Sequence, residues 1–264
     1  MKFANFSKLA LFSLLAGVLA LALAGCGASN NLALSQGNWS MTATPSGGGT
    51  FYIGGNLTQN GGSLAGTMYV VSSGCYSSSQ TVTFTGTVKG TKVTLTSASV
   101  GGEVITIAAT GTSGSALTGT YTIAGGTTCN GETGTLTANP VPSIGASWSG
   151  PILNDAFGDP NVTFSVALTQ AHSASSDGTF ALTGNITFTG SSCSVSGTLN
   201  SAFIAGPYLL INGSTLETDN STGDFSYQQV LLNNSSTPTS MTGTYQVNSG
   251  LCANDLTSAT FTKQ

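Results

Sequence analysis

The segment TVTFTGTV, residues 81–88, alternates between two kinds of side chain with a strict period of two. Val82, Phe84 and Val88 fall on one face, and threonines occupy every position on the other. Such alternation is typical of a β-strand that buries one face and leaves the other in water, and β-branched residues favour that conformation. The segment therefore predicts a strand of an antiparallel sheet that covers an apolar core.

The same alternation recurs along the chain. In the second half, residues 180–188 place Phe180, Leu182, Ile186 and Phe188 on one face. Clusters of glycine, serine and asparagine separate such segments and are typical of turns. Because helical periodicity is missing after the first 25 residues, we predict an all-β fold of many short antiparallel strands.

A glycine stands at the centre of many of these strands, on the apolar face. An apolar residue lies two positions before it and another two positions after it in Leu64-Gly66-Met68, Phe84-Gly86-Val88, Leu117-Gly119-Tyr121, Leu182-Gly184-Ile186, Val195-Gly197-Leu199 and Met241-Gly243-Tyr245. Glycine within a strand gives up packing and costs conformational entropy, so its repeated use indicates strands that bend sharply around a small closed core. About eight strand-like segments in each half then favour an up-and-down β-barrel, with a β-sandwich as the alternative.

The two halves of the chain share short motifs in the same order. Asn38-Trp39-Ser40 matches Ser147-Trp148-Ser149, Leu57-Thr58-Gln59 matches Leu168-Thr169-Gln170, and Thr118-Gly119-Thr120-Tyr121 matches Thr242-Gly243-Thr244-Tyr245. Self-similarity in a constant order indicates an internal repeat. Two prolines one residue apart interrupt the chain between the halves. We therefore expect one β domain over residues 36–139, a linker over 140–143 and a second β domain over 144–264.

Two of these motifs resemble strands of the calycin superfamily, the lipocalin-like and avidin-like barrels. Gly37-Asn38-Trp39 is similar to the Gly-x-Trp of the first strand, and residues 117–121 (LTGTY) are similar to an avidin strand. The resemblance implies the barrel shape only. Arginine, which covers the tryptophan in lipocalins, is absent from the chain, and two tryptophans are too few for the aromatic walls of an avidin-type biotin site. We expect Trp39 and Trp148 to be core plugs at one barrel end.

The N-terminus has the features of an export signal. Lys2 and Lys8 flank the start of an apolar stretch, residues 9–24, that is too short to span a bilayer comfortably. Leu23-Ala24-Gly25-Cys26 closes this stretch and resembles the lipobox of bacterial lipoproteins. The resemblance implies that residues 1–25 are a signal peptide, that Cys26 carries acyl chains such as palmitate, and that residues 26–35 are a lipidated tether. Ordinary secretion without lipidation is the alternative.

The resemblance also implies an address. Gly27 occupies the position at which aspartate commonly retains such lipoproteins in the inner membrane. We therefore expect a lipid-anchored protein of the bacterial cell envelope that is transferred to the outer membrane, on its periplasmic face or at the cell surface.

Four cysteines remain after Cys26, and disulfides persist in exported proteins. Three pairings are possible, and the duplication favours Cys75–Cys129 and Cys193–Cys252, because each repeat then closes its own bond. In an eight-stranded barrel Cys75 falls between the third and fourth strands and Cys129 between the seventh and eighth, at the same end. A metal site is the alternative, although no Cys-x-x-Cys spacing or histidine accompanies these thiols.

Charge is sparse. Charged residues make up 5% of the chain, and three lysines after the leader, Lys89, Lys92 and Lys263, stand against nine acidic residues. Nucleic-acid binding needs lysine and arginine to neutralise phosphates and release counterions, so we expect no nucleic-acid partner. Phosphorylated ligands are disfavoured for the same reason.

Candidate catalytic residues are few. His172 is the only histidine, and a triad with Asp177 and a serine has nothing in the sequence to position it, so an exposed loop residue is the simpler interpretation. A calcium-binding loop could be formed by Asn154, Asp155 and Asp159, with a solvated loop as the alternative. A glycosidase carboxylate pair could come from Glu217, Asp219 and Asp224, although the first half has no equivalent of this set. We expect no enzymatic activity, no metal and no cofactor.

Composition, leader and repeats together predict a membrane-anchored extracytoplasmic lipoprotein that is a structural or interaction module. Its partner would be an envelope protein or a glycan. The alternative is a small-ligand binder that holds a hydrophobic compound or a sugar in a barrel mouth, which requires a cavity with convergent polar groups. A transmembrane barrel with its apolar face in lipid is a further alternative, for which the sequence offers no aromatic girdle.

Overall fold

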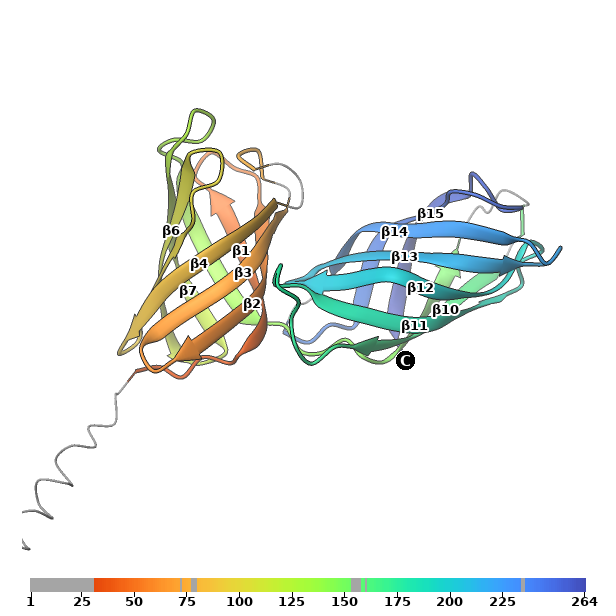
Figure 1. Cartoon of the computed structure of the whole chain (residues 1–264), viewed down its shortest axis with the longest axis horizontal. Helices are drawn as coiled ribbons and strands as arrows, with labels where there is room; N and C mark the ends of the chain where they lie inside the picture. The colour runs from red at the N-terminus through yellow and green to blue at the C-terminus, as the bar shows by residue number, and fades with distance from the viewer. Residues whose placement is uncertain (1–30, 72, 77–79, 153–157, 160, 234–235) are drawn as a thin grey trace, which may run out of the picture.

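The fold was obtained as a computed structural model, which describes residues 31–71, 73–76, 80–152, 158–159, 161–233 and 236–264. Within these ranges the chain forms sixteen β-strands and no α-helix. The strands close into two eight-stranded antiparallel barrels, one after the other in the chain (Figure 1). The predictions of an all-β fold and of tandem up-and-down barrels are confirmed, and the β-sandwich alternative is wrong.

Barrel 1 is a meander in which each strand pairs with the next, and β1 pairs with β8 to close it. Its strands are β1 (Gly37–Pro45), β2 (Phe51–Asn60), β3 (Ser63–Val71), β4 (Gln80–Lys89), β5 (Lys92–Ser97), β6 (Glu103–Ser113), β7 (Ala116–Gly125) and β8 (Thr133–Pro140).

Barrel 2 repeats this order and closes through β16 and β9. Its strands are β9 (Ser147–Ile152), β10 (Val162–Gln170), β11 (Phe180–Thr189), β12 (Ser194–Ala205), β13 (Tyr208–Glu217), β14 (Thr222–Leu232), β15 (Ser240–Val247) and β16 (Leu256–Lys263).

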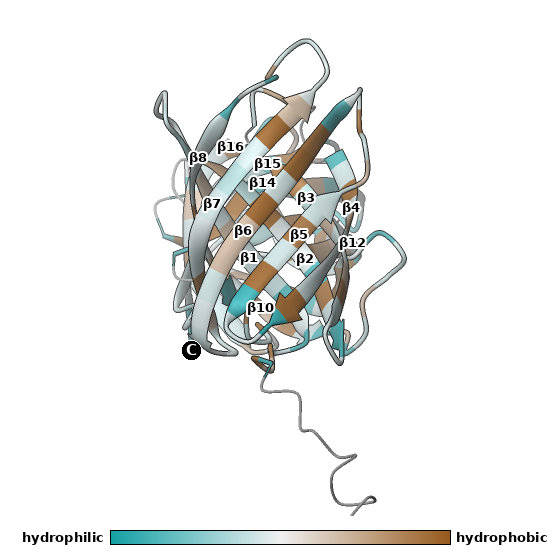
Figure 2. Ribbon diagram, turned by 90° about the vertical axis from the view of Figure 1, so that its left-hand side faces the viewer, coloured by the Kyte–Doolittle hydropathy of each residue, from teal (hydrophilic) through white to brown (hydrophobic). Residues whose placement is uncertain are grey.

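Side chains alternate between the barrel interior and solvent as the period-two pattern predicts. On β4, Val82, Phe84 and Val88 are buried, whereas Thr83 and Thr85 are exposed. Apolar and polar residues alternate in the same way along the strands of barrel 1 that face the viewer in Figure 2. The threonines and serines of the sequence therefore provide a neutral outer surface.

Aromatic rings fill the interiors. Phe51 and Tyr121 pack edge to face in barrel 1, with ring centroids 5.3 Å apart. In barrel 2, Phe164 stacks on Phe261 at 4.6 Å and meets Phe188 at 5.5 Å. Ring pairs of this kind add to the stabilisation that burial itself provides. The space inside each barrel is thus occupied by the protein's own side chains.

The two tryptophans close the same end of their barrels. Trp39 and Trp148 are both fully buried. The indole N–H of each donates a hydrogen bond to the carbonyl four residues earlier, Trp39 to Ser35 at 2.7 Å and Trp148 to Ile144 at 3.0 Å. A buried indole needs such an acceptor. This shared arrangement confirms the internal repeat at atomic level.

The strand glycines lie where neighbouring backbones approach too closely for a side chain. A Cβ on Gly86 would overlap the carbonyl oxygen of Thr94 on β5, and one on Gly119 would overlap that of Ala108 on β6. Glycine is the residue that tolerates such an approach at bends of a closed sheet. The glycine pattern therefore marks barrel curvature, as predicted.

The segment before β1 packs against one end of barrel 1, which we call the base of barrel 1; it is formed by the turns around residues 60–63, 89–92 and 113–116. Leu34 is buried, and the backbone N–H groups of Leu32 and Ser35 donate to the carbonyls of Gly90 and Gly114, at 2.8 and 3.0 Å. The described part of the predicted tether, residues 31–35, is therefore part of the barrel structure.

The barrels touch through β1 and β2 of barrel 1 and the turns at one end of barrel 2 (Figure 1). The buried amide of Asn38 spans the gap: its Nδ2 donates to the carbonyl of Gly206 at 3.2 Å, and its Oδ1 accepts the Gly206 N–H at 2.7 Å. The Asn56 N–H donates to the Gly178 carbonyl at 3.1 Å. A Cβ on Gly206 would meet the backbone of Gly54, so glycines permit this close contact.

Candidate functional site

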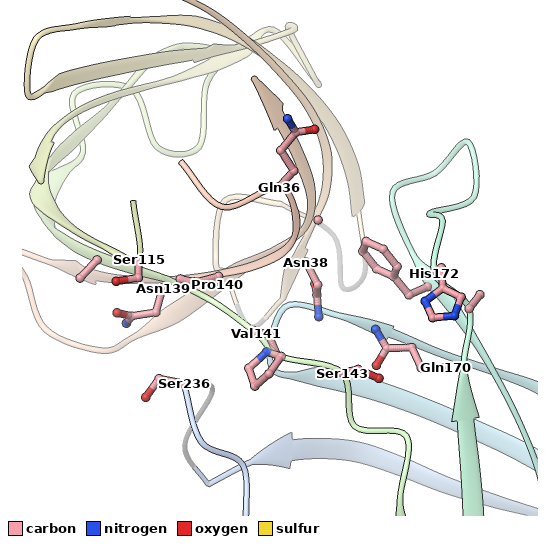
Figure 3. A pocket seen from close by; sticks show the side chains of 15 residues that line it. Gln36, Asn38, Ser115, Asn139, Pro140, Val141, Ser143, Gln170, His172 and Ser236 are labelled. Carbon is pink, nitrogen blue, oxygen red and sulfur yellow. The ribbon is translucent and has the colours of Figure 1, made fainter. Parts of the chain in front are cut away.

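A pocket of about 640 Å³ lies where the two barrels and their linker meet (Figure 3). We call it the junction pocket. Barrel 1 contributes the start of β1, the start of β7 and the end of β8, and the linker 141–143 runs along it. Barrel 2 contributes the end of β10, the start of β11 and the neighbouring turns. Its volume falls in the range typical of small-ligand sites, about 300–1,000 Å³.

The lining of the junction pocket is polar and without formal charge. Among the described residues that line it, none is Asp, Glu, Lys or Arg. The polar side chains are amides, hydroxyls and one imidazole, from Gln36, Asn38, Ser115, Asn139, Ser143, Gln170, His172 and Ser236. The apolar lining comes from Pro140, Val141, Pro142 and Phe180, together with two alanines. The pocket therefore combines hydrogen-bonding groups with apolar faces.

The equivalent glutamines of the two repeats, Gln59 and Gln170, differ in how many hydrogen bonds their side-chain amides make. In barrel 1, Gln59 accepts from the Leu34 N–H at 2.7 Å and donates to the carbonyls of Leu32 and Gly61, at 3.0 and 2.8 Å. Its repeat counterpart Gln170 accepts from the Ile144 N–H at 3.0 Å in the same manner. No acceptor for the Gln170 Nε2 is found among the described residues. Both the oxygen and the nitrogen of the Gln59 amide are therefore hydrogen-bonded, whereas at the wall of the pocket only the oxygen of the Gln170 amide is bonded within the described part of the chain.

Two further polar groups of the pocket are uncommitted. The side-chain amide of half-buried Asn139 and the imidazole of exposed His172 have no hydrogen-bond partner in the part of the chain that the structure describes. The Oε1 of Gln36 is likewise left over, because its Nε2 alone is used, to the Gln59 carbonyl at 3.3 Å. Sequence reasoning pointed to His172 but missed the amides that line the same pocket, since they come from both repeats.

The two disulfides lie at the opposite ends of the barrels from the tryptophans. Cys75 bonds to Cys129, 54 residues apart, and Cys193 bonds to Cys252, 59 residues apart. Each bond joins the loop between the third and fourth strands to the loop between the seventh and eighth strands. The predicted pairing is confirmed. These four sulfurs are in disulfides, so they are not thiolate ligands for a metal.

A turn next to the second cysteine of each disulfide is built alike in both barrels. In barrel 1 the N–H of Gly131 donates to the Ile123 carbonyl at 2.9 Å, and in barrel 2 that of Asn254 donates to Val247 at 3.1 Å. Gly131 and Asn254 both have positive φ, +88° and +83°, and asparagine is among the residues that tolerate this region. An acidic residue follows each of them in the sequence.

A buried carboxylate supports each of these turns. Glu103 accepts the N–H of Cys129 at 2.9 Å, and Glu217 accepts that of Cys252 at 3.4 Å. Glu217 also accepts the N–H of Leu251 and the hydroxyl of Ser221. Glu103 is therefore the structural counterpart of Glu217, which the sequence comparison did not reveal. Alignment hides the pair because Glu217 ends the fifth strand of its barrel and Glu103 begins the sixth.

At the disulfide end of barrel 1, two buried polar atoms have no hydrogen-bond partner among the described residues. The second oxygen of Glu103 and the hydroxyl of Tyr76 are buried without a partner among the described residues. Burial raises the pKa of Tyr76 to about 12, and the nearby Glu103 and Glu132 carboxylates add to the shift. Tyr121 is better placed, because its hydroxyl donates to Glu132 at 2.8 Å.

The other residues considered for catalysis are not assembled into a site. Asp177 accepts from the N–H and hydroxyl of Thr179, at 3.1 and 2.8 Å, and makes no hydrogen bond to His172 among the bonds of the described residues. Asp219 accepts the N–H of Ser221 in its own turn, and Asp224, near the start of β14, accepts the hydroxyl of Ser249 from the loop between β15 and β16.

The remaining sequence candidates lie at the far end of barrel 2 or outside the description. Asp159 accepts the Ser192 N–H at 2.6 Å. Cys26, Asn154 and Asp155 lie outside the described residues.

One pocket does lie at a barrel mouth. It has a volume of about 470 Å³ and is formed at the disulfide end of barrel 1 by the β1–β2 turn, Ser73, Gly74 and Glu132. Its wall contains three consecutive glycines, residues 47–49, and one oxygen of the Glu132 carboxylate is committed to Tyr121. The junction pocket offers more uncommitted polar side chains.

Neither a scan against protein-family models nor a search of curated proteins returned a match for this chain. Among the described residues, no α-helix has both the length and the hydropathy needed to cross a bilayer.

Proposed function

We propose that the protein is an extracytoplasmic lipoprotein, anchored through Cys26, that acts as a non-enzymatic binding module through its junction pocket. The observation that carries this proposal is that side chains fill the barrel interiors, whereas polar side chains without hydrogen-bond partners among the described residues line the junction pocket. Phe164, Phe261 and their neighbours occupy the interior of barrel 2, as Phe51 and Tyr121 do in barrel 1. The free amides gather outside, between the repeats.

The packing of residues 31–35 supports a close link between anchor and pocket. With Cys26 acylated, only residues 26–30 separate the lipid from the base of barrel 1. A fully extended chain spans at most about 3.6 Å per residue, so this separation is at most about 18 Å. Gln36 and Ser115, at the same base, line the junction pocket. The pocket would then lie close to the membrane surface.

Several acyl chains on one residue give stable anchoring without a transmembrane segment. Replacing Cys26 by serine removes the acceptor thiol and should move the protein from the membrane fraction to the soluble extracytoplasmic fraction. Continued fractionation of Cys26→Ser with membranes would contradict the anchor and favour a transmembrane barrel.

The disulfides allow a second, independent test of location. In an exported protein Cys75, Cys129, Cys193 and Cys252 should resist thiol labelling until a reductant is added. Deletion of residues 1–25 should keep the chain in the reducing cytoplasm and expose all four thiols to the reagent. Labelling of all four in the exported protein without reductant would refute the proposed compartment.

A binder that uses a barrel mouth is the second candidate function. It is favoured only by the 470 Å³ pocket at the disulfide end of barrel 1. A ligand there would contact Glu132 and perturb Tyr121, which is a different outcome from one at the junction pocket.

A further inference from the structure

The uncommitted groups of the junction pocket include both hydrogen-bond donors and acceptors. The Nε2 of Gln170 is a donor, the Oε1 of Gln36 is an acceptor, and the amide of Asn139 and the imidazole of His172 offer both. A matching ligand must therefore both donate and accept hydrogen bonds. Hydroxyl groups do this, because each is one donor and two acceptors.

The charge of the pocket excludes ionic ligands. In the described part of the chain, no lysine or arginine lines it to neutralise an anion, and no aspartate or glutamate lines it to neutralise a cation. Enclosing an ionised group without a counter-charge is costly. A neutral ligand is the class that the lining accepts.

The pocket also presents apolar surface. Pro140, Val141, Pro142 and Phe180 line it together with the amides. A sugar ring has the complementary character, with hydroxyls around its rim and C–H groups on its faces. We propose that the junction pocket binds a neutral carbohydrate; this rests on the proposed function and names the ligand class of that same site.

The walls of the pocket are held in place before any ligand arrives. Asn38 joins the barrels by two hydrogen bonds to Gly206. The ring of Tyr69 packs on that of Phe203, with centroids 5.4 Å apart, and its hydroxyl meets Asp177 at 3.5 Å. A preformed site needs less ordering when it binds, which favours weakly interacting neutral ligands.

A neutral peptide is the competing macromolecular ligand, and the fold disfavours it. Extended peptides are commonly bound by adding a strand to an open sheet edge. In both barrels the first and last strands pair with each other, so the described sheets leave no such edge. The pocket offers side-chain amides in place of a backbone ladder.

The test is a calorimetric titration of the protein, purified after full-length expression, with a panel of neutral oligosaccharides that includes maltotriose, cellotriose and triacetylchitotriose. At least one should bind saturably. Its affinity should not change between low and high salt, because no ion pair forms. The carboxylate-bearing counterpart of the binding sugar should not bind.

Two variants locate the binding, and one controls for general damage. Asn139→Ala removes an uncommitted amide. Gln170→Glu keeps the acceptor for the Ile144 N–H but removes the free donor and adds a charge. Each should weaken binding about tenfold or more, since one lost hydrogen bond is worth roughly 1.4 kcal/mol or a factor of ten. Asn161→Ala, an exposed asparagine at the far end of barrel 2, should not affect it.

Three results would overturn the inference: no binding by any member of the panel, binding that Asn139→Ala and Gln170→Glu leave unchanged, or binding of a neutral peptide of similar size but of no sugar. Because the titration uses purified protein, its outcome does not depend on the lipid anchor. If no sugar binds but Cys26→Ser moves to the soluble fraction as predicted, the proposed ligand class is rejected while the proposed lipid anchor stands. A ligand that perturbs Tyr121 instead would reject the junction pocket itself.

Discussion

At the level of single residues, the most consequential side chains are the two buried glutamates beside the disulfides. Glu217 accepts hydrogen bonds from two backbone N–H groups and the Ser221 hydroxyl, and it is 1% exposed. Hydrogen bonds to a charged group are worth about 1.5–3 kcal/mol each, and buried donors left without an acceptor add their own cost. The carboxylate therefore holds the 247–256 loop against the end of β13.

We predict that Glu217→Ala lowers the free energy of unfolding by about 3 kcal/mol, because the N–H groups of Leu251 and Cys252 lose their acceptor. Urea denaturation at neutral pH measures the change. Asp219→Ala, an exposed acid in the same turn, is the matched control and should leave the midpoint almost unchanged. Equal midpoints for the two variants would show that Glu217 does not support the loop.

Tyr76 should behave in the opposite way. Its buried hydroxyl has no described partner, so Tyr76→Phe should leave stability at neutral pH unchanged or raise it by about 1 kcal/mol. Tyr121→Phe, in the same barrel mouth, loses the bond to Glu132 and should cost about 1 kcal/mol. A cost for Tyr76→Phe as large as that for Tyr121→Phe would mean that the hydroxyl is paired.

Tyr76 also predicts a pH dependence. Its pKa is about 12 in the folded state and about 10 in an unfolded chain, so the folded state holds the phenolic proton more tightly. The stabilisation is complete below about pH 10 and is lost as the pH rises through about 12. Between about pH 10 and 12, the free energy of unfolding should therefore fall less steeply with pH for Tyr76→Phe than for the unchanged protein.

Much of the residue-level picture follows from the sequence, and some does not. The disulfide pairing was predictable because the duplication assigns one bond to each repeat. The equivalence of Glu103 and Glu217 was not predictable, because Glu217 ends the fifth strand of its barrel whereas Glu103 begins the sixth strand of its own. The junction pocket was also hidden, since Asn139 and Gln170 line one pocket only when the repeats are placed together.

At the level of strands, alternation and glycine placement contain most of the fold. Residues 81–88 lie within β4, and their threonines face solvent as predicted. The segment 31–35 differs, because it has no strand pattern and yet packs on the base of barrel 1 through Leu34 and backbone hydrogen bonds. Loop contacts of this kind leave no periodic signal in a sequence.

The strand glycines give a prediction at this scale. Gly86→Ala places a Cβ against the Thr94 carbonyl, and overpacking of this kind costs about 1–3 kcal/mol. Thr85→Ala, at the exposed position just before it, should cost less than half as much. Thermal unfolding of both variants compares them directly. Equal losses would mean that the sheet can relax around a side chain at this bend.

At the level of the whole molecule, the amide of Asn38 makes two of the hydrogen bonds that join the barrels. The Asn56–Gly178 hydrogen bond and the Tyr69–Phe203 ring contact join them as well. We predict that Asn38→Ala leaves both barrels folded but loosens their relative orientation, because two hydrogen bonds to Gly206 are lost. Residual dipolar couplings should fit one alignment tensor in the unchanged protein and two in the variant. Ser147→Ala, the repeat counterpart at an exposed position, should retain a single tensor.

Ligands are proposed to bind between the barrels and not inside them, and the chain supplies reporters for both places. His172 is the only histidine and lines the junction pocket. Met41 and Met68 are buried in barrel 1 and Met241 in barrel 2. In an NMR titration with the neutral oligosaccharide that binds, the imidazole signals of His172 should shift saturably while the three methionine methyl signals stay in place. Shifts of the methionine methyls with a stationary His172 would contradict the claim and return the binding site to a barrel interior.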